Sequence, residues 1–155
     1  MNTFKIALVE VSTPSTHVYS RTYIPRIGIP TLAALLKERG FACDVWFQAL
    51  PGYQEERLLA YDIIGIGSLS NTISAAYRLA GFLKGKGKVV VMGGPHVSFM
   101  PEEALAYCDY VVIGEGEAAF PALIDALSRG ETPDTVPGLA YTLPDGAVHR
   151  TPASD

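Results

Sequence analysis

The residues best suited to bind a ligand lie in two glycine-rich segments. Each segment directly follows a short apolar run. Gly93-Gly94-Pro95-His96 follows the run Val89–Met92, and Gly114-Glu115-Gly116-Glu117 follows Tyr110–Ile113. Glycine lets the backbone approach a ligand closely, and a helix that begins after such a turn offers free N–H groups. Ligands of open α/β sheets bind at the carboxyl ends of the strands. The two segments therefore predict a ligand site at one edge of a parallel sheet.

The elements that must position this site alternate along the 155-residue chain. Short apolar runs typical of buried parallel strands are followed by helical patterns, which predicts right-handed βαβ units. We predict an α/β fold with a doubly wound, five-stranded parallel sheet of flavodoxin-like (Rossmann-like) order 2-1-3-4-5. The predicted strands are Lys5–Val11, Ala42–Phe47, Ile63–Gly67, Lys88–Met92 and Tyr110–Ile113, and the longer helices are Pro30–Arg39, Asn71–Lys84 and Glu117–Ser128.

The pattern changes after Gly130. The segments Gly138–Leu143 and Ala147–Thr151 flank the turn Pro144-Asp145-Gly146, which is typical of a small β-hairpin. We expect residues 1–130 to form the α/β domain, and residues 131–155 to form a hairpin and linker toward a further domain. On this interpretation the sequence is the N-terminal part of a longer protein.

Composition excludes several classes of function. The net charge is −4, and no basic stripe indicates a nucleic-acid partner. No apolar run approaches the ~20 residues that cross a bilayer, and the first residues do not form a secretory signal. Cys43 and Cys108 lie far apart without a Cys-x-x-Cys spacing, which favours a reducing cytoplasm and gives no metal site by itself.

Other ligands of such folds can be compared with the predicted loops. A phosphoryl-accepting receiver needs an aspartate after the third strand, where this chain has Gly67 and Ser68. A flavin phosphate fits the hydroxyls of Ser12–Thr16, but that loop lacks glycine, and Pro14 removes an N–H donor. Gly65 and Gly67 match a dinucleotide motif only in part and indicate plain strand-end glycines. A flavin-binding electron carrier stays as one alternative.

An ordered set of segments resembles a known family. It is similar to the cobalamin (vitamin B12)-binding domain that precedes the catalytic domain of many radical S-adenosylmethionine enzymes. Members include methyltransferases and oxygen-independent relatives of magnesium-protoporphyrin IX monomethyl ester cyclase. The resemblance covers nearly the whole chain through Pro25–Gly28, Leu32–Leu35, Asp62–Leu69, Gly93–His96, Pro101–Ala104, Asp109–Val112, Gly114–Glu117 and Val136–Tyr141.

The resemblance implies a role for each loop. The corrin ring would lie over the carboxyl edge, while the nucleotide tail would enter beside the central strands, where Gly93 and Gly94 leave room. Gly67 stands where the family commonly has serine, so that Ser68 or Ser70 would substitute. The cofactor-binding residues implied are Ser68, Leu69, Ser70, Gly93, Gly94, Pro95, His96, Gly114, Glu115 and Gly116.

The loop after the first strand lacks the Asp-x-His-x-x-Gly motif whose histidine ligates cobalt in domains of the methionine-synthase type. His17 lies there without the flanking aspartate and glycine, so the expected state is base-off cobalamin without a protein ligand to cobalt. Tyr19, Arg21 and Tyr23 are candidates for contact with the corrin or its side arms.

A second motif is also missing. Radical chemistry needs Cys-x-x-x-Cys-x-x-Cys to hold a [4Fe–4S] cluster, which this sequence lacks. We therefore expect the cluster and S-adenosylmethionine only in a downstream catalytic domain, within a parent methyltransferase or oxidative cyclase. The chain alone would bind and not catalyse. The alternative within the family is a cofactor-free relic that acts as an interaction interface.

Overall fold

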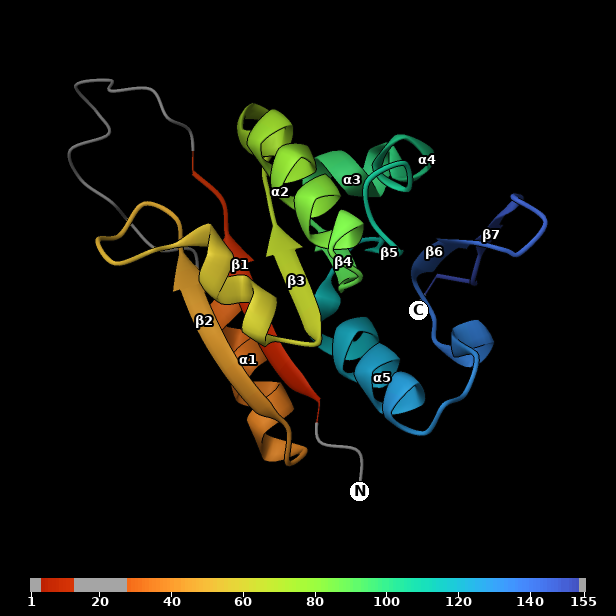
Figure 1. The fold of residues 1–155 in the computed structure, drawn as a ribbon. Helices are drawn as coiled ribbons and strands as arrows, with labels where there is room; N and C mark the ends of the chain where they lie inside the picture. Colours follow the sequence, from red (N-terminus) through yellow and green to blue (C-terminus); the bar gives the residue numbers. More distant parts are fainter. Residues whose placement is uncertain (1–3, 13–27, 154–155) are drawn as a thin grey trace.

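The computed structural model describes residues 4–12 and 28–153, which form one sheet with helices on both faces (Figure 1). Most elements fall where the periodicity places them. The strands are β1 (Lys5–Glu10), β2 (Ala42–Phe47), β3 (Ile63–Gly67), β4 (Val89–Gly93), β5 (Tyr110–Val112), β6 (Leu139–Thr142) and β7 (Val148–Arg150). The α-helices are α1 (Gly28–Glu38), α2 (Ile73–Gly85), α3 (Pro95–Phe99), α4 (Pro101–Ala104) and α5 (Gly116–Ser128), with 3₁₀ helices at Glu55–Ala60, Ser70–Thr72 and Pro133–Thr135.

The sheet has the order β2-β1-β3-β4-β5-β6-β7. Its first five strands are parallel, which confirms the predicted order 2-1-3-4-5. The predicted hairpin also forms, but it does not stand apart: β6 pairs antiparallel with β5, and β7 pairs antiparallel with β6. The sheet therefore has seven strands of mixed direction rather than five, because β6 covers the edge of β5 that would otherwise stay unpaired. The boundary at residue 130 stays a prediction, and the sheet continues across it.

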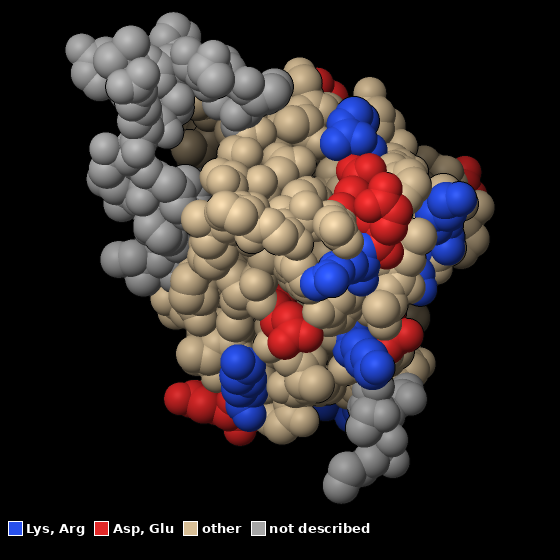
Figure 2. Space-filling model, turned by 60° about the vertical axis from the view of Figure 1, so that its left-hand side comes forward, with Lys and Arg blue, Asp and Glu red and all other residues tan. Residues whose placement is uncertain are grey.

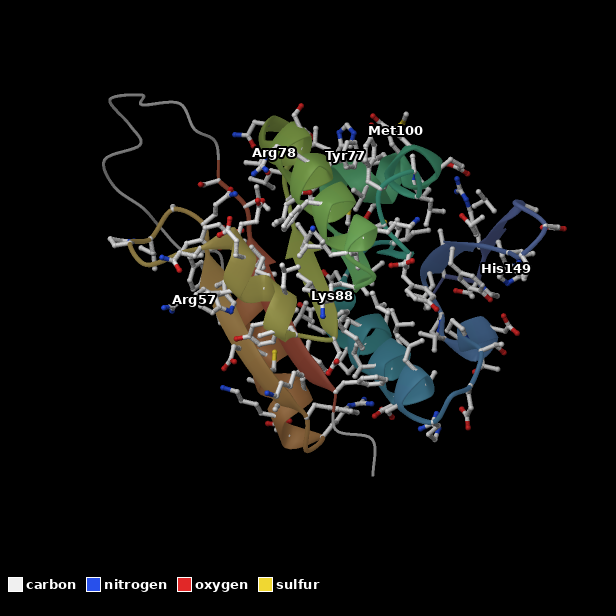
Figure 3. All side chains as sticks on the ribbon, in the orientation of Figure 1. Arg57, Tyr77, Arg78, Lys88, Met100 and His149 are labelled. Carbon is white, nitrogen blue, oxygen red and sulfur yellow. The ribbon has the colours of Figure 1, made fainter. Side chains whose placement is uncertain are left out.

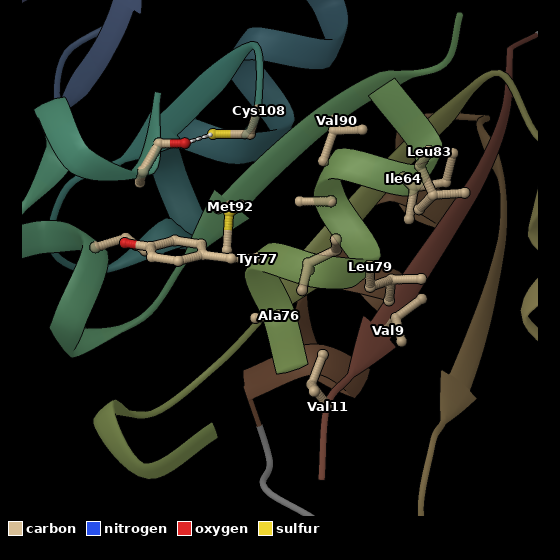
Figure 4. Packing of buried hydrophobic residues seen from close by; sticks show 14 of the residues in the cluster. Val9, Val11, Ile64, Ala76, Tyr77, Leu79, Leu83, Val90, Met92 and Cys108 are labelled. Atoms are coloured by element: carbon tan, nitrogen blue, oxygen red, sulfur yellow. Dashed lines mark hydrogen bonds between the residues drawn. The ribbon is translucent and has the colours of Figure 1, made fainter. Parts of the chain in front are cut away.

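Helices cover the two faces of the sheet in separate groups. Residues of α1 and α5 pack against Ile6, Leu8 and Val91 on one face. Residues of α2, α3 and α4 pack against the neighbouring strand positions on the other face. Figure 4 shows side chains of β1, β3 and β4 packed against α2 on this second face. Since successive side chains of a strand point to opposite faces, each strand supplies both clusters.

Helix α3 was not predicted, and it lies inside the segment that matters most for the site. Here the sequence has a glycine-rich segment and indicates no helix before Pro101, whereas five residues from Pro95 form a helix. Gly94 precedes it with φ of +126°, and the Ser98 N–H donates to the Gly94 carbonyl (3.1 Å). A helix this short contains too few turns to produce a periodic apolar pattern.

The described surface carries charges of both signs. On the face shown in Figure 2, acidic and basic side chains are interspersed rather than gathered into a patch of one sign. Among the residues that the structure describes, no helix has the length and apolar character needed to cross a membrane.

Candidate ligand-binding site

Three glycines leave the sheet bare near the carboxyl ends of β3 and β4. Gly65 and Gly67 are two positions apart, so both face the side covered by α1 and α5. In the parallel register Gly67 lies beside Gly93 of β4, and Gly65 lies beside Val91. The central strands therefore present backbone rather than side chains at this place.

A pocket occupies this bare stretch and opens at the carboxyl edge. Its cavity volume is about 160 Å³, and it is open to solvent. Its walls are largely apolar, and the helices on both sides contribute, with Ile29 and Leu32 from α1 and Phe120 from α5. Such a lining suits an apolar part of a ligand that is larger than the cavity itself. The lining residues are Leu8, Gly28, Ile29, Leu32, Gly65, Ile66, Gly67, Ser68, Val91, Gly93, Gly94, Val112, Gly114, Gly116 and Phe120.

The three strand glycines differ in what lies above them. A Cβ at Gly65 would meet Leu8 Cδ2 at 2.6 Å and Phe120 Cζ at 3.2 Å. A Cβ at Gly67 would meet Ile29 Cδ1 at 2.9 Å. A Cβ at Gly93 would meet no described residue within 4 Å. Described side chains thus cover the first two glycines, whereas residues 4–12 and 28–153 leave free space over Gly93.

Two glycine turns border the pocket at its mouth. Gly94 has φ of +126°, and a Cβ there would lie 2.0 Å from the carbonyl oxygen of Ser68. Gly114 has φ of +79°, a conformation that side-chain-bearing residues rarely adopt. Both turns therefore require glycine for reasons of backbone geometry.

Ser68 places one polar side chain in this apolar setting. The residue is fully buried, and its Oγ has no hydrogen-bond partner among the described residues. Its backbone N–H donates to the carbonyl oxygen of Gly93 (3.2 Å), which fixes the residue beside the pocket. An unsatisfied buried hydroxyl costs about 1–3 kcal/mol, so a ligand atom that bonded to it would recover that loss.

The structure brings five of the ten predicted site residues into the pocket lining: Ser68, Gly93, Gly94, Gly114 and Gly116. The other five do not line it, namely Leu69, Ser70, Pro95, His96 and Glu115. They lie in the same edge loops and in α3, and their contact with a ligand stays a prediction. His17, Tyr19, Arg21 and Tyr23 fall outside the described residues.

His96 has partners on α4 and α2. Its Nε2 lies 3.1 Å from Glu103 Oε2, and its ring meets the edge of Tyr77 with ring centroids 6.3 Å apart. Burial, with Glu103 nearby, raises the pKa of Tyr77 to about 12. Tyr77 also stacks on Tyr107, and Figure 3 labels Tyr77 beside the short helices. His96 is thus held in an aromatic cluster rather than in the pocket.

Sequence reasoning missed the apolar walls and two of the bare glycines. Gly65 and Gly67 were interpreted as plain strand-end glycines, although their spacing of two puts both on one face. Combined with the predicted strand order, that spacing could have placed them beside Gly93.

The cysteines do not form a metal site. Burial raises the pKa of Cys43 to about 11 and that of Cys108 to about 12, so both stay protonated near neutral pH. Cys108 donates to the carbonyl of Ala104, as drawn in Figure 4. Iron–sulfur clusters are held by thiolates. No group of three or more His, Cys, Asp or Glu side chains in the described ranges could hold a metal ion.

The fold and pocket define an α/β domain that binds a ligand at the carboxyl edge of a parallel sheet. The sequence model of the B12-binding domain matches residues 18–124. The chain belongs to the B12-binding domain family.

Known proteins agree with this assignment and with the family resemblance of the sequence. The uncharacterized methyltransferase PH0819 of Pyrococcus horikoshii is 35% identical over 140 residues, covering 83% of this chain and 30% of that protein. The anaerobic magnesium-protoporphyrin IX monomethyl ester cyclase of Rubrivivax gelatinosus is 31% identical over 144 residues, covering 83% and 26%. The structure of the cobalamin-dependent S-adenosylmethionine radical enzyme OxsB with aqua-cobalamin bound shares the fold, with a TM-score of 0.81 and 22% identity. That match covers 99% of this chain and 23% of OxsB. The chain spans less than a third of the length of each.

Proposed function

We propose that this chain is the cobalamin-binding module of a radical S-adenosylmethionine enzyme. The observation that carries the proposal is the space over Gly93 that the described residues leave free, which is bounded by apolar side chains and by the Ser68 hydroxyl, for which the described residues offer no partner. The nucleotide tail of the cofactor is a flat aromatic base on a polar arm, which matches an apolar slot with one hydrogen-bonding group. When bound, cobalamin supplies the cobalt chemistry, and the protein supplies binding and orientation.

Each part of the pocket has a distinct role in this proposal. Gly93 leaves the room that the tail occupies, and Ser68 Oγ hydrogen-bonds to a polar atom of the tail. Leu8, Val91 and Phe120 exclude water from the slot. The turns at Gly94 and Gly114 stand at the mouth, where the corrin ring would lie over the sheet edge.

We further propose that the cofactor is bound base-off without a protein ligand to cobalt. His96 is bonded to Glu103, and His149 packs against Tyr141 in the hairpin, where Figure 3 labels it. Neither of these described histidines lines the pocket. His17 lacks the flanking aspartate and glycine of a cobalt-ligating motif.

The radical reaction is proposed to belong to a separate catalytic domain that holds the [4Fe–4S] cluster and S-adenosylmethionine. Two observations support this division: both thiols of the chain are buried and protonated, and the match covers less than a third of each relative's length. Strand β7 runs back toward the carboxyl edge, where the Gly138 N–H donates to the Pro152 carbonyl. Residues 131–155 would thus lead toward a domain that faces the pocket, in a cytoplasmic enzyme.

The test is reconstitution with hydroxocobalamin, removal of free cofactor by desalting, and an absorption spectrum. We expect a stable corrinoid spectrum and a 1:1 complex. The diagnostic variant is Gly93→Val, because no described residue lies within 4 Å of a Cβ at this position and the branched side chain would extend into the slot. We expect it to weaken binding by at least about 10-fold, from overpacking against the bound tail.

The matched control is Gly85→Val, at the exposed end of α2, where a Cβ also meets nothing within 4 Å. It should bind as the wild type does. A correctly folded wild-type protein that stays colourless contradicts the proposal. It would favour the cofactor-free relic, whereas a yellow protein after flavin reconstitution would favour the electron carrier.

A further inference from the structure

Ser98 joins the two glycine turns at the mouth of the pocket. Its Oγ donates to the carbonyl oxygen of Gly94 (2.8 Å) and accepts from the backbone N–H of Gly114 (2.9 Å). The first bond is a local one, from a helical residue back to the fourth residue before it. The second crosses from α3 to the turn after β5, sixteen residues further along the chain.

Both turns belong to the pocket, but Ser98 itself does not line it. The Gly94 turn is packed against Ser68, whose carbonyl would be only 2.0 Å from a Cβ at Gly94. The Gly114 turn is anchored on its other side by the Ile113 N–H, which donates to the Gly138 carbonyl (2.8 Å). Ser98 therefore links one turn that is fixed by β3 and β4 to another that is fixed by β5 and β6.

We infer that Ser98 is a positioning residue that sets the separation of the Gly94 and Gly114 turns and so shapes the mouth of the pocket for its ligand. This inference rests on the proposed cobalamin site. A hydroxyl is suited to this place because it donates and accepts at once. Alanine would lose both bonds, and the Gly94 carbonyl would keep its bond from the Ser98 N–H.

We expect the loss of Ser98 Oγ to reduce the affinity for the ligand more than it reduces the stability of the fold. Gly114 is exposed, so water can replace the hydroxyl as the acceptor for its N–H. The Gly114 turn is then no longer held at a fixed distance from Gly94. Ligand binding must order the turn, and the free energy that this requires lowers the affinity. We expect Ser98→Ala to fold normally and to bind hydroxocobalamin about 10-fold more weakly.

The experiment compares the wild type with Ser98→Ala, Ser98→Thr and Ser128→Ala. Threonine keeps the hydroxyl and should restore binding to within about threefold of the wild type. Ser128→Ala removes a comparable local bond, from Ser128 Oγ to the Asp125 carbonyl (2.7 Å), at the far end of α5, and should leave affinity unchanged. Without corrinoid, amide exchange at Gly114 should be about fivefold faster or more in Ser98→Ala.

The inference is overturned if Gly114 exchanges at the wild-type rate in Ser98→Ala, whether or not corrinoid binds. It is also overturned if Ser98→Ala binds hydroxocobalamin as tightly as the wild type, a result that leaves the cobalamin site intact. Absence of binding by the wild type would contradict the proposed function instead, and the exchange rate at Gly114 would still decide whether Ser98 holds the turn.

Discussion

Gly93 and Gly94 are neighbours in the sequence, but they lack side chains for different reasons. Gly93 has ordinary strand geometry and faces space that no described residue fills. The absence of a side chain there therefore leaves room for the ligand. Gly94 has a positive φ and lies against the Ser68 carbonyl. The absence of a side chain there is therefore needed for the backbone to fold in this way. Their place after an apolar strand predicted both as ligand-binding residues, and the family resemblance implied that the ligand is the cofactor. The sequence could not separate their roles, which depend on contacts with another loop.

This distinction predicts the effect of Gly94→Ala. The new Cβ would collide with a backbone oxygen, which cannot rotate away as a side chain can, and the backbone would be strained at positive φ. We expect a loss of about 2–4 kcal/mol in the free energy of unfolding. Thermal denaturation should show a Tm lower by roughly 5–15 °C. Gly93→Ala should stay within a few degrees of the wild type, and equal melting of the two variants would contradict this account.

At the scale of elements, local pattern was enough for most of the parallel sheet. Strands β2 and β3 have the predicted bounds, and helices α1, α2 and α5 differ from prediction only near their ends. The apolar walls of the pocket were not predictable, since they depend on which side chains α1 and α5 project over β3 and β4. Pairing of the hairpin with β5 was also missed, because a turn motif indicates a hairpin but does not identify its neighbour.

The pairing of β6 with β5 predicts that the hairpin stabilises the α/β domain. Val136, Leu139 and Ala140 are buried by the fold, and β6 closes the sheet edge at β5. A protein ending at residue 130 should lose about 3 kcal/mol or more, and its Tm should fall by roughly 6–12 °C. The exposed Val148→Thr in β7 is the control and should change stability by less than about 0.5 kcal/mol. A truncated protein as stable as the full chain would show that residues 131–155 are only a linker.

At the scale of the whole molecule, one edge of the sheet gathers every feature of the proposed site. The parallel strands end there, the pocket opens there, and β7 returns there. This arrangement suits the proposed role as a cofactor-binding module, because the pocket and the end of β7 lie at the same edge. The family assignment agrees with the architecture, and the length of the relatives agrees with a further domain.

The central claim is that the slot over Gly93 holds the nucleotide tail of cobalamin. Its most direct test is a pair of titrations of the wild type, one with hydroxocobalamin and one with cobinamide, which has the corrin ring but no tail. We predict that hydroxocobalamin binds at least about 10-fold more tightly, because only it buries an aromatic base in the slot. In Gly93→Val this advantage should fall to within about twofold, since the slot is filled. Equal affinity of the wild type for the two corrinoids would contradict the claim.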